Sequence, residues 1–116
     1  MNTNNEIKAH VLSIIDTLEN PPRLNSDQLE ERGERPNEKV IISGLDYLSD
    51  VLDVEWILNA DKTLKGARLL VAFGGPNIYI STATSTVEGH WWNDSYSASY
   101  TDNMGLEEAV QELFDC

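Results

Sequence analysis

The sequence predicts an α+β fold, in which two N-terminal helices and one C-terminal helix pack on an antiparallel meander of four or five strands. Three observations lead to this prediction. Apolar residues recur at helical spacing near both ends of the chain, and they alternate with polar residues in between. The alternating segments are joined by short turns, which favour antiparallel pairing of neighbouring strands. The length of 116 residues fits one domain, and we expect residues 1–116 to form it.

The first helix is predicted over residues 5–19. Its apolar positions repeat every three or four residues and are Ile7, Val11, Ile14, Ile15 and Leu18. Asn20-Pro21-Pro22 ends this helix, because proline breaks the hydrogen-bond ladder and restricts the residue before it. Residues 23–37 carry mixed charges together with Gly33 and Pro36, so we expect a mobile polar connector there.

A second helix is predicted over about residues 37–52. Its apolar stripe consists of Ile41, Leu45, Leu48 and Leu52. Asp46, Asp50 and Asp53 fall on its other faces, where we expect them to be exposed. Gly44 either lowers the stability of this helix by ~1 kcal/mol relative to alanine or allows a neighbouring segment to approach closely.

From residue 54 the period of the apolar residues changes from 3.6 to 2, which is typical of strands. Four strands are predicted, at residues 54–58, 66–73, 78–82 and 86–92. Residues 93–103 fit either an edge strand or a loop, because tyrosine and alanine alternate with serine and threonine there. The chain closes with a helix at 105–115, for which Asp102 or Asn103 is the expected N-cap.

Strand alternation divides the predicted sheet into two faces. The face that we expect in the core consists of Val54, Trp56, Leu58, Leu69, Val71, Phe73, Ile78, Ile80, Val87 and Trp91. The opposite face mixes apolar, aromatic and charged groups and consists of Glu55, Ile57, Arg68, Leu70, Ala72, Tyr79, Glu88, His90 and Trp92. Either a helix covers this second face or it is a binding surface.

Two segments invite a chemical interpretation. Gly74-Gly75-Pro76-Asn77 follows a strand, as a phosphate-binding loop would, but a strand rather than a helix comes next. No Lys or Arg occurs after Arg68 to meet a phosphate, so we interpret this segment as a hairpin turn. His90 and Asp94, with Glu88, His10 and Asp102 available, are candidates for metal binding or proton transfer.

The spacing of His90 and these carboxylates matches no known ligand pattern, so we expect no metal and no cofactor. Twenty Asp and Glu residues guarantee coincidental carboxylate pairs, and no Gly-x-Ser-x-Gly motif marks a nucleophile. We therefore expect a binding protein rather than an enzyme. A small hydrolase-like enzyme that uses His90 and nearby carboxylates is the alternative.

The charge distribution is the most informative feature. The net charge is −12, and all eight Lys and Arg lie within residues 8–68. A chain this acidic repels nucleic acid and anionic membranes, so we expect no direct contact with either. We expect it instead to bind a basic protein surface, such as that of a nucleic-acid-binding protein, by imitating the spacing of phosphates. The expected partner-binding residues are Asp46, Asp50, Asp53, Glu88, Trp92, Asp94, Glu107, Glu108 and Glu112.

A third hypothesis is a structural or assembly subunit that binds through the sheet face carrying Trp92. The polar residues 1–6 lack the pattern of a signal peptide, and no apolar run approaches the ~20 residues that span a bilayer. The single cysteine, Cys116, makes no internal disulfide. These features lead us to expect a cytoplasmic protein.

The segment Gly74–Ile80, Gly-Gly-Pro-Asn-Ile-Tyr-Ile, is followed by Val87–Trp92, Val-Glu-Gly-His-Trp-Trp. This pair of segments resembles that of an uncharacterised group of small acidic proteins from bacteria and their mobile elements. The resemblance covers roughly residues 66–115 and carries no catalytic residue with it. It implies an accessory protein of a phage or plasmid. Combined with the acidity, it suggests an inhibitor of the anti-restriction or anti-CRISPR type.

Overall fold

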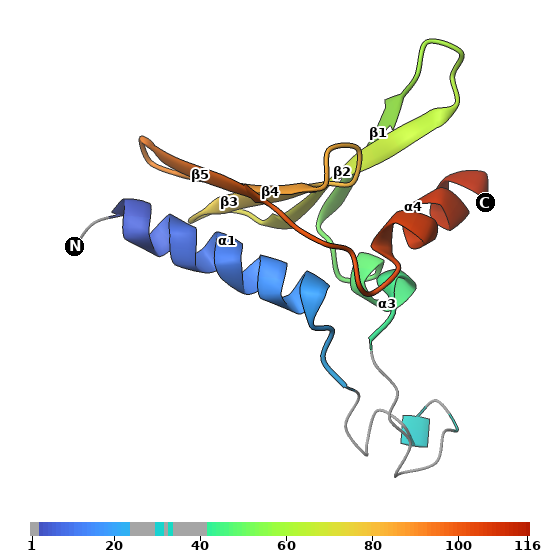
Figure 1. Cartoon of the computed structure of the whole chain (residues 1–116), viewed down its shortest axis with the longest axis horizontal. Coiled ribbons are helices and arrows are strands. Elements are labelled where there is room, and N and C mark those ends of the chain that lie inside the picture. Colours follow the sequence, from blue (N-terminus) through green and yellow to red (C-terminus); the bar gives the residue numbers. More distant parts are fainter. Residues whose placement is uncertain (1–2, 24–29, 32, 34–41) are drawn as a thin grey trace.

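A computed structural model describes residues 3–23, 30–31, 33 and 42–116 of the chain. The strands are β1 Asp53–Leu58, β2 Leu64–Ala72, β3 Asn77–Ser81, β4 Thr86–Trp91 and β5 Asp94–Ser99. Each strand pairs antiparallel with the next, so the order in the sheet is β1-β2-β3-β4-β5 (Figure 1). The described helices are α1 Thr3–Glu19, α3 Gly44–Leu48 and α4 Leu106–Asp115. The predicted α+β meander is confirmed, and the segment 93–103 contains the fifth strand.

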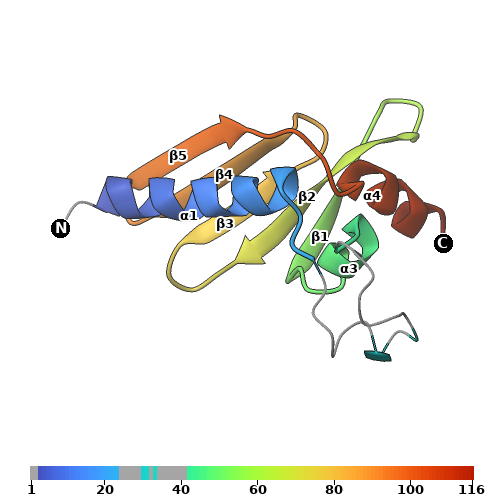
Figure 2. The ribbon, with the colours of Figure 1, turned by 60° about the horizontal axis from the view of Figure 1, so that its bottom comes forward.

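The described helices all lie on the same face of the sheet (Figures 1 and 2). α1 runs along β4 and β5, whereas α3 and α4 pack against each other and α4 contacts β2. The core lies between these helices and the sheet, and its fully enclosed side chains are Ile7, Val11, Leu18, Leu69, Ile78, Ile80, Val87, Leu106 and Val110. None of the described helices covers the other face of the sheet.

α1 lies directly on β4, which explains a glycine in the middle of that strand. A Cβ atom added at Gly89 would lie 2.7 Å from Ile7 Cδ1 and 2.7 Å from Val11 Cγ2. Both of these side chains are fully buried. Any larger residue at position 89 would push the helix away from the sheet. The predicted helix over 5–19 is confirmed, with its apolar stripe in the core.

The loop between β5 and α4 supplies hydrogen-bond partners to the last residues of α1 and the first residues of α4. Asn103 donates its side-chain N–H to the carbonyl of Glu19 at 2.8 Å and its backbone N–H to the carbonyl of Leu18 at 3.2 Å. These bonds satisfy carbonyl groups at the end of α1 that have no partner within the helix. Asp102 caps α4: its carboxylate accepts the backbone N–H groups of Met104, Gly105, Leu106 and Glu107. The predicted closing helix is confirmed, but its N-cap residue is Gly105 rather than Asp102 or Asn103. Gly105 has no side chain to bond the free N–H groups, and the Asp102 carboxylate does so from three residues before it.

The second predicted helix is wrong over much of its length. Within the described residues it is α3, which ends at Leu48, whereas residues 37–41 lie outside them. Ser43 and Asp46 form a reciprocal capping box that begins the helix at Gly44. Pairing with the sheet then replaces the helix, because the N–H of Leu52 donates to the carbonyl of Leu70 at 2.8 Å.

The apolar stripe predicted for this helix is therefore also wrong. Leu45 is 49% exposed and Leu52 is 61% exposed, and only Leu48 is buried. Ile41, the first member of the stripe, lies outside the described residues. A stripe at helical spacing requires at least two continuous turns, and α3 has little more than one.

Two aromatic residues expected in the core are exposed. Phe73 is 74% exposed, because β2 ends at Ala72 and a register shift between Leu70 and Ala72 breaks the strict alternation just before it. Trp56 is 39% exposed. Its ring lies edge-on against Phe114 of α4, with 5.3 Å between the centroids.

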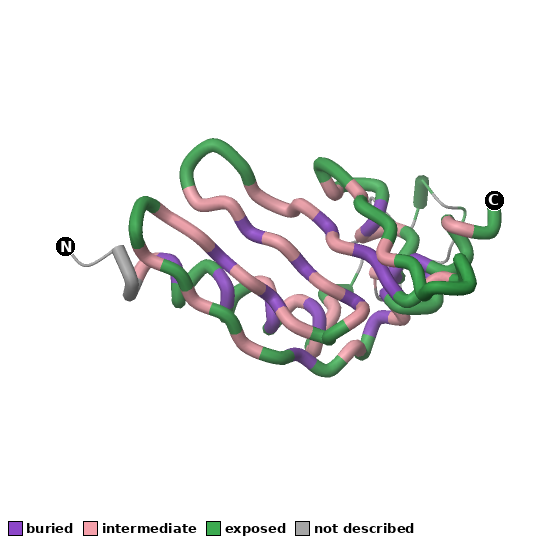
Figure 3. The backbone as a smooth tube through the Cα atoms, turned by 90° about the horizontal axis from the view of Figure 1, so that it is seen from above, coloured by how far each residue is buried: buried purple, intermediate pink, exposed green. Residues whose placement is uncertain are grey.

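The other predicted core positions follow the alternation along the central strands (Figure 3). Ile78 is buried as expected, and Trp91 is partly buried against the core. The Trp91 ring lies 6.0 Å from that of His10 on α1. Leu58 is 46% exposed, because the register of β1 shifts between Ile57 and Leu58.

The mobile connector predicted over 23–37 lies outside the described residues, except for Arg23, residues 30–31 and Gly33. Its flanks meet, because the N–H of Ile42 donates to the carbonyl of Pro22 at 2.9 Å. Among the helices described, none combines the length and the apolar character needed to cross a membrane.

Candidate functional site

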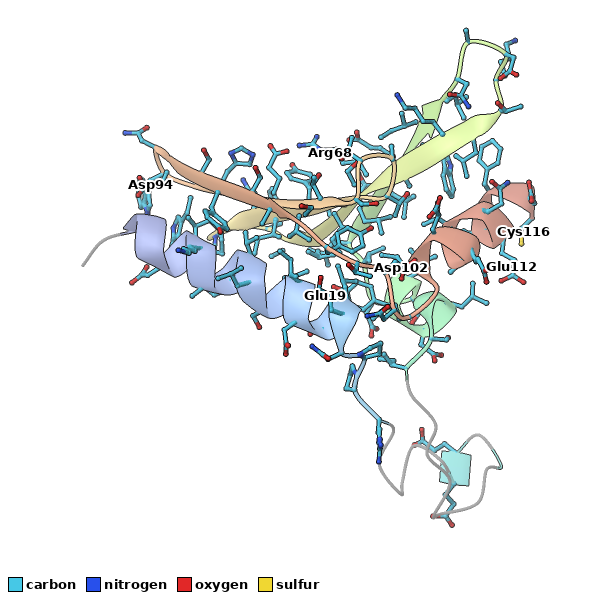
Figure 4. All side chains as sticks on the ribbon, viewed as in Figure 1. Glu19, Arg68, Asp94, Asp102, Glu112 and Cys116 are labelled. Atoms are coloured by element: carbon cyan, nitrogen blue, oxygen red, sulfur yellow. The ribbon has the colours of Figure 1, made fainter. Side chains whose placement is uncertain are left out.

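The residues expected to bind a partner lie in separate parts of the molecule. Glu112 lies on α4 at one end of it, and Asp94 lies at the other, beside the start of α1 (Figure 4). Glu88 stands on the uncovered face of the sheet, opposite Tyr79 of β3 and Ser97 of β5. The structure therefore divides the predicted set into three groups: an acidic end, an uncovered sheet face and an aromatic end of the sheet.

The first group is the acidic end, which we define as Glu107, Glu108 and Glu112 of α4 together with the neighbouring α3. Leu106, Ala109 and Val110 bury one face of α4 in the core. All three glutamates are exposed as a consequence. Asp115 follows them on the same helix and accepts hydrogen bonds from the Gln111 side chain at 3.1 and 3.2 Å.

Two hollows border Glu108. One has a volume of about 180 Å³, lies between α3 and α4, and is lined by Ser43, Gly44, Leu45, Met104, Gly105, Glu108, Ala109 and Glu112. The other has a volume of about 550 Å³ and is lined by Leu64, Lys65, Gly66, Thr82, Asp102, Gly105, Glu107, Glu108, Val110 and Gln111. Glu108 thus forms a ridge between a groove with an apolar wall and a larger polar hollow.

Lys65 brings a positive charge to this end, as a lining residue of the larger hollow. Within the described residues no carboxylate lies within ion-pair distance of it. Asp102 is already bound to four backbone N–H groups. Glu107, Glu108 and Glu112 therefore keep their negative charge unpaired by any described residue.

The aspartates predicted to extend this surface along the second helix do not share one face. Asp46 belongs to the capping box, where its Oδ2 accepts the N–H of Ser43 at 3.0 Å. Asp50 lines a third hollow of about 240 Å³, on the side of α3 that faces Ile14 of α1. Asp53 begins β1 and lies opposite Leu70 on the uncovered face. The spacing expected for a helical row is therefore wrong here, since only Asp46 is in the helix.

The second group is the uncovered sheet face. Arg68 projects from it, away from the helices (Figure 4). Its guanidinium stacks on the Tyr79 ring at 3.6 Å from the centroid. His90 and Glu88 stand two residues apart on β4 and point to this same face, where His90 Nε2 and Glu88 Oε1 are 2.5 Å apart. These side chains are 43% and 44% exposed, so the pair is open to solvent.

His90 and Asp94 do not come together. His90 is opposite Ser95, and Trp91 is opposite Asp94, so the two-residue turn places His90 and Asp94 on opposite faces. The sequence had suggested them as a pair, whereas the structure brings Glu88 to His90. Across the described residues there is no cluster of three or more His, Cys, Asp or Glu placed to hold a metal ion.

The third group is an aromatic end of the sheet. Trp92 occupies the turn between β4 and β5 and is 84% exposed. Because the meander reverses at every turn, the turn between β2 and β3, which carries the exposed Phe73, lies at the same end. Trp92 has a φ of 58°, which is rare for a bulky residue. The exposure of Phe73 was not predicted, although the glycines that follow it were a signal that the strand had ended.

Two tyrosines lie beneath the acidic end. Burial raises the pKa of Tyr47 above its ordinary value. Burial also raises the pKa of Tyr100, and the negative charges of Asp102 and Glu107 raise it further. Both hydroxyls stay neutral at physiological pH, so neither is available as a phenolate for acid–base chemistry.

Comparison with known protein families, curated proteins and solved structures finds no match to this chain.

Proposed function

We propose that this protein is an acidic interaction module that binds a basic surface of a partner protein. The observation that carries the proposal is the acidic end, where Glu107, Glu108 and Glu112 project together from one helix with no described cation paired to them. Uncompensated charge of this kind reduces the stability of the folded chain through self-repulsion. Binding to a basic partner would relieve that repulsion.

The surroundings of these glutamates suit a protein partner. Leu45 is 49% exposed and lines the groove beside Glu108 and Glu112, and Leu113 is 41% exposed on α4. Interfaces commonly combine an apolar centre with a charged rim. A basic segment with one or two apolar side chains would place those side chains against Leu45 and its positive charges against the glutamates.

More specifically, we propose that the partner is a protein that normally binds nucleic acid. Glu108 and Glu112 are four residues apart, which places their Cβ atoms ~5–6 Å apart on one side of the helix. This is close to the separation of neighbouring phosphates along one strand. An inhibitor that occupies the phosphate-binding surface of such a partner would compete directly with DNA or RNA.

The experiment is capture of partners from a cell extract with the tagged full chain, at about 50 and at about 200 mM salt. The test variant carries Glu107→Lys, Glu108→Lys and Glu112→Lys. The control variant carries Glu30→Lys, Glu31→Lys and Glu55→Lys, which make the same change of net charge at exposed positions elsewhere. We expect basic proteins to be retained by the wild type and the control, to be lost with the test variant, and to be lost at the higher salt concentration.

Competition with duplex DNA tests whether the partner normally binds nucleic acid. Displacement of a captured protein by DNA would support mimicry of nucleic acid, whereas capture that DNA leaves unchanged would support only a general basic partner. The proposal fails if wild type and test variant retain the same proteins in the same amounts at both salt concentrations. Association rates should fall more than dissociation rates rise when the three glutamates are reversed.

A further inference from the structure

β5 forms one edge of the sheet. The alternation of hydrogen-bonded and non-bonded pairs between β5 and β4 shows which backbone groups of β5 face outward. Tyr100 donates its N–H to the carbonyl of Ser85 at 3.0 Å, so these two residues form a hydrogen-bonded pair of the ladder. Such pairs alternate with non-bonded ones along an antiparallel ladder. The register therefore places the bonded positions of β5 at Ala98, Tyr96 and Asp94. The N–H and C=O groups that point away from β4 are those of Ser95, Ser97 and Ser99.

Within the described residues nothing binds these outward groups. The next outward N–H is that of Thr101, and it donates to the Glu19 carboxylate at 2.9 Å. The edge is thus closed at Thr101 and unpaired from Ser95 to Ser99. An unpaired row of this kind is a template for the addition of another strand.

The two edges of the sheet differ in how they are protected. β1 carries Asp53 and Glu55, and its register shifts between Ile57 and Leu58. Charges and irregularities discourage strand addition. β5 has no charged residue and no proline over residues 95–99, and it pairs with β4 without a register shift.

We infer that β5 pairs with β5 of a second copy of this chain, antiparallel about a two-fold axis at Ser97. In this register Ser97 is opposite Ser97 of the second copy, and Ser95 is opposite Ser99. Each of these pairs exchanges two backbone hydrogen bonds, which gives about six across the junction. The two sheets become one continuous sheet of twice the width.

The side chains of β5 fit this register. Serines alone occupy its uncovered face over residues 95–99, and their small hydroxyls pair well across strands. On the helix face, Tyr96 would stand opposite Ala98 of the second copy, so that a large side chain meets a small one at both symmetry-related positions.

The side of α1 that lies beneath β5 carries residues that complement the same side of α1 in a second copy. Lys8 lies 5.7 Å from the centre of the Tyr96 ring and Glu19 binds Thr101, so α1 and β5 run in the same direction. Lys8, Leu12 and Asp16 are all exposed and spaced four residues apart, which places them in one row along the helix. Leu12, at the centre of this row, is 42% exposed.

A two-fold axis at Ser97 makes the two copies of α1 antiparallel. With strands ~4.8 Å apart and α1 beneath β4 and β5, the two helix axes lie roughly 10–14 Å apart. Leu12 then meets Leu12 of the second copy, and Lys8 approaches Asp16. This alternation of positive, apolar and negative residues favours a second copy over a basic segment, which Lys8 would repel.

The salt dependence separates this inference from binding to a basic partner. Two chains of net charge −12 repel each other, and salt screens that repulsion. Pairing of two copies should therefore hold or strengthen as the salt concentration rises, whereas binding of a basic partner weakens. Reversal of Glu107, Glu108 and Glu112 should leave the pairing in place.

The first test is the mass of the untagged full chain in solution, measured by light scattering and native mass spectrometry at low and high salt. We expect twice the chain mass of 13.0 kDa. Ser97→Pro removes the central outward N–H without removing a bond to β4, and should weaken dimerisation at least about tenfold. Asn59→Pro cannot serve as the control, because the N–H of Asn59 donates to a carbonyl within its own turn. Gly75→Ala is the control instead, because its added Cβ meets no atom within 4 Å.

The second test fixes the register. Ser97→Lys and Ser97→Glu should each be monomeric, because the two-fold axis places like charges opposite each other. An equimolar mixture of the two should form mixed dimers. A monomeric wild type at high concentration, a dimer that Ser97→Pro leaves intact, or failure of the lysine and glutamate variants to pair would each overturn the inference. Circular dichroism of each variant shows that it is folded.

Discussion

Gly44, at the start of α3, lies directly against the backbone of Gly105, which precedes α4. A Cβ atom added at Gly44 would lie 2.4 Å from the carbonyl oxygen of Gly105 and 2.9 Å from Ala109 Cβ. The N–H of Gly44 donates to the carbonyl of Met104 at 3.0 Å, which holds the two segments together. The close approach of α3 and α4, and hence the shape of the groove beside Glu108, depends on this contact.

Gly44→Ala should therefore lower the free energy of unfolding by about 1–3 kcal/mol, because the added methyl meets backbone that cannot move aside. Gly75→Ala is the matched control, since no atom lies within 4 Å of its added Cβ and its φ lies outside the left-handed region. Denaturant unfolding compares the two variants. Equal stability of both would mean that α3 and α4 do not pack as closely as described.

Asp102→Ala should cost about 1–3 kcal/mol, because four backbone N–H groups at the start of α4 lose their acceptor. Asp115→Ala is the control, since among the described residues that carboxylate binds the exposed Gln111 side chain alone. Hydrogen exchange should show faster exchange of the first turn of α4 in the Asp102 variant. If the exchange there stayed at the wild-type rate, Asp102 would not be the cap.

The raised pKa of Tyr100 predicts a loss of stability at alkaline pH. In the unfolded chain a tyrosine releases its proton near pH ~10, but in the fold the burial of Tyr100 keeps its proton on at that pH. The unfolded state then binds fewer protons than the folded state, so the free energy of unfolding is intact below pH ~10 and falls as the pH rises above it.

Urea unfolding between about pH 8 and about pH 11 measures this loss. Tyr100→Phe should show a shallower alkaline decline than the wild type, and Tyr47→Phe should show a smaller change of the same sign. Titration of the phenolate absorbance gives an independent check. Ionisation of every tyrosine at its ordinary pKa in the folded protein would contradict the burial of Tyr100.

Trp92 should contribute nothing to stability, because it is 84% exposed and holds a φ of 58°. Trp92→Asn should leave the free energy of unfolding unchanged or raise it by up to about 1 kcal/mol, since asparagine adopts the left-handed conformation more readily. Trp56→Ala, which removes a contact with Phe114, is the contrasting variant and should destabilise. A clear loss of stability in Trp92→Asn would show that the Trp92 side chain packs against the fold.

The order and pairing of the elements could be predicted from the sequence because they depend on periodicity. Ile7, Val11 and Leu18 share a helical face, and the alternation around Leu69 and Ile78 defines the strands. The end of α3 could not be predicted in this way, because pairing of Leu52 with Leu70 competes with the helix and depends on a distant part of the chain. The capping box of Ser43 and Asp46 was visible as a local signal for where the helix begins.

The candidate site was predictable only in part, for a similar reason. Exposure of Glu107, Glu108 and Glu112 follows from the amphipathic pattern of α4 alone. The position of α4 beside α3 depends on the contact between Gly44 and Gly105, which no local pattern in the sequence encodes. The pairing of His90 with Glu88 rather than Asp94 depends on the length of one turn, since a single additional residue there would exchange the faces.

The hydrogen bond between the Ile42 N–H and the Pro22 carbonyl places both ends of the connection from α1 to α3 at one point of the fold. The entropy of closing a loop depends only weakly on its length, with about 0.6 kcal/mol for each doubling. A reporter domain inserted between these residues would therefore be attached through two adjacent points. It would leave both the acidic end and the β5 edge unmodified, as would a natural lengthening or shortening of this stretch.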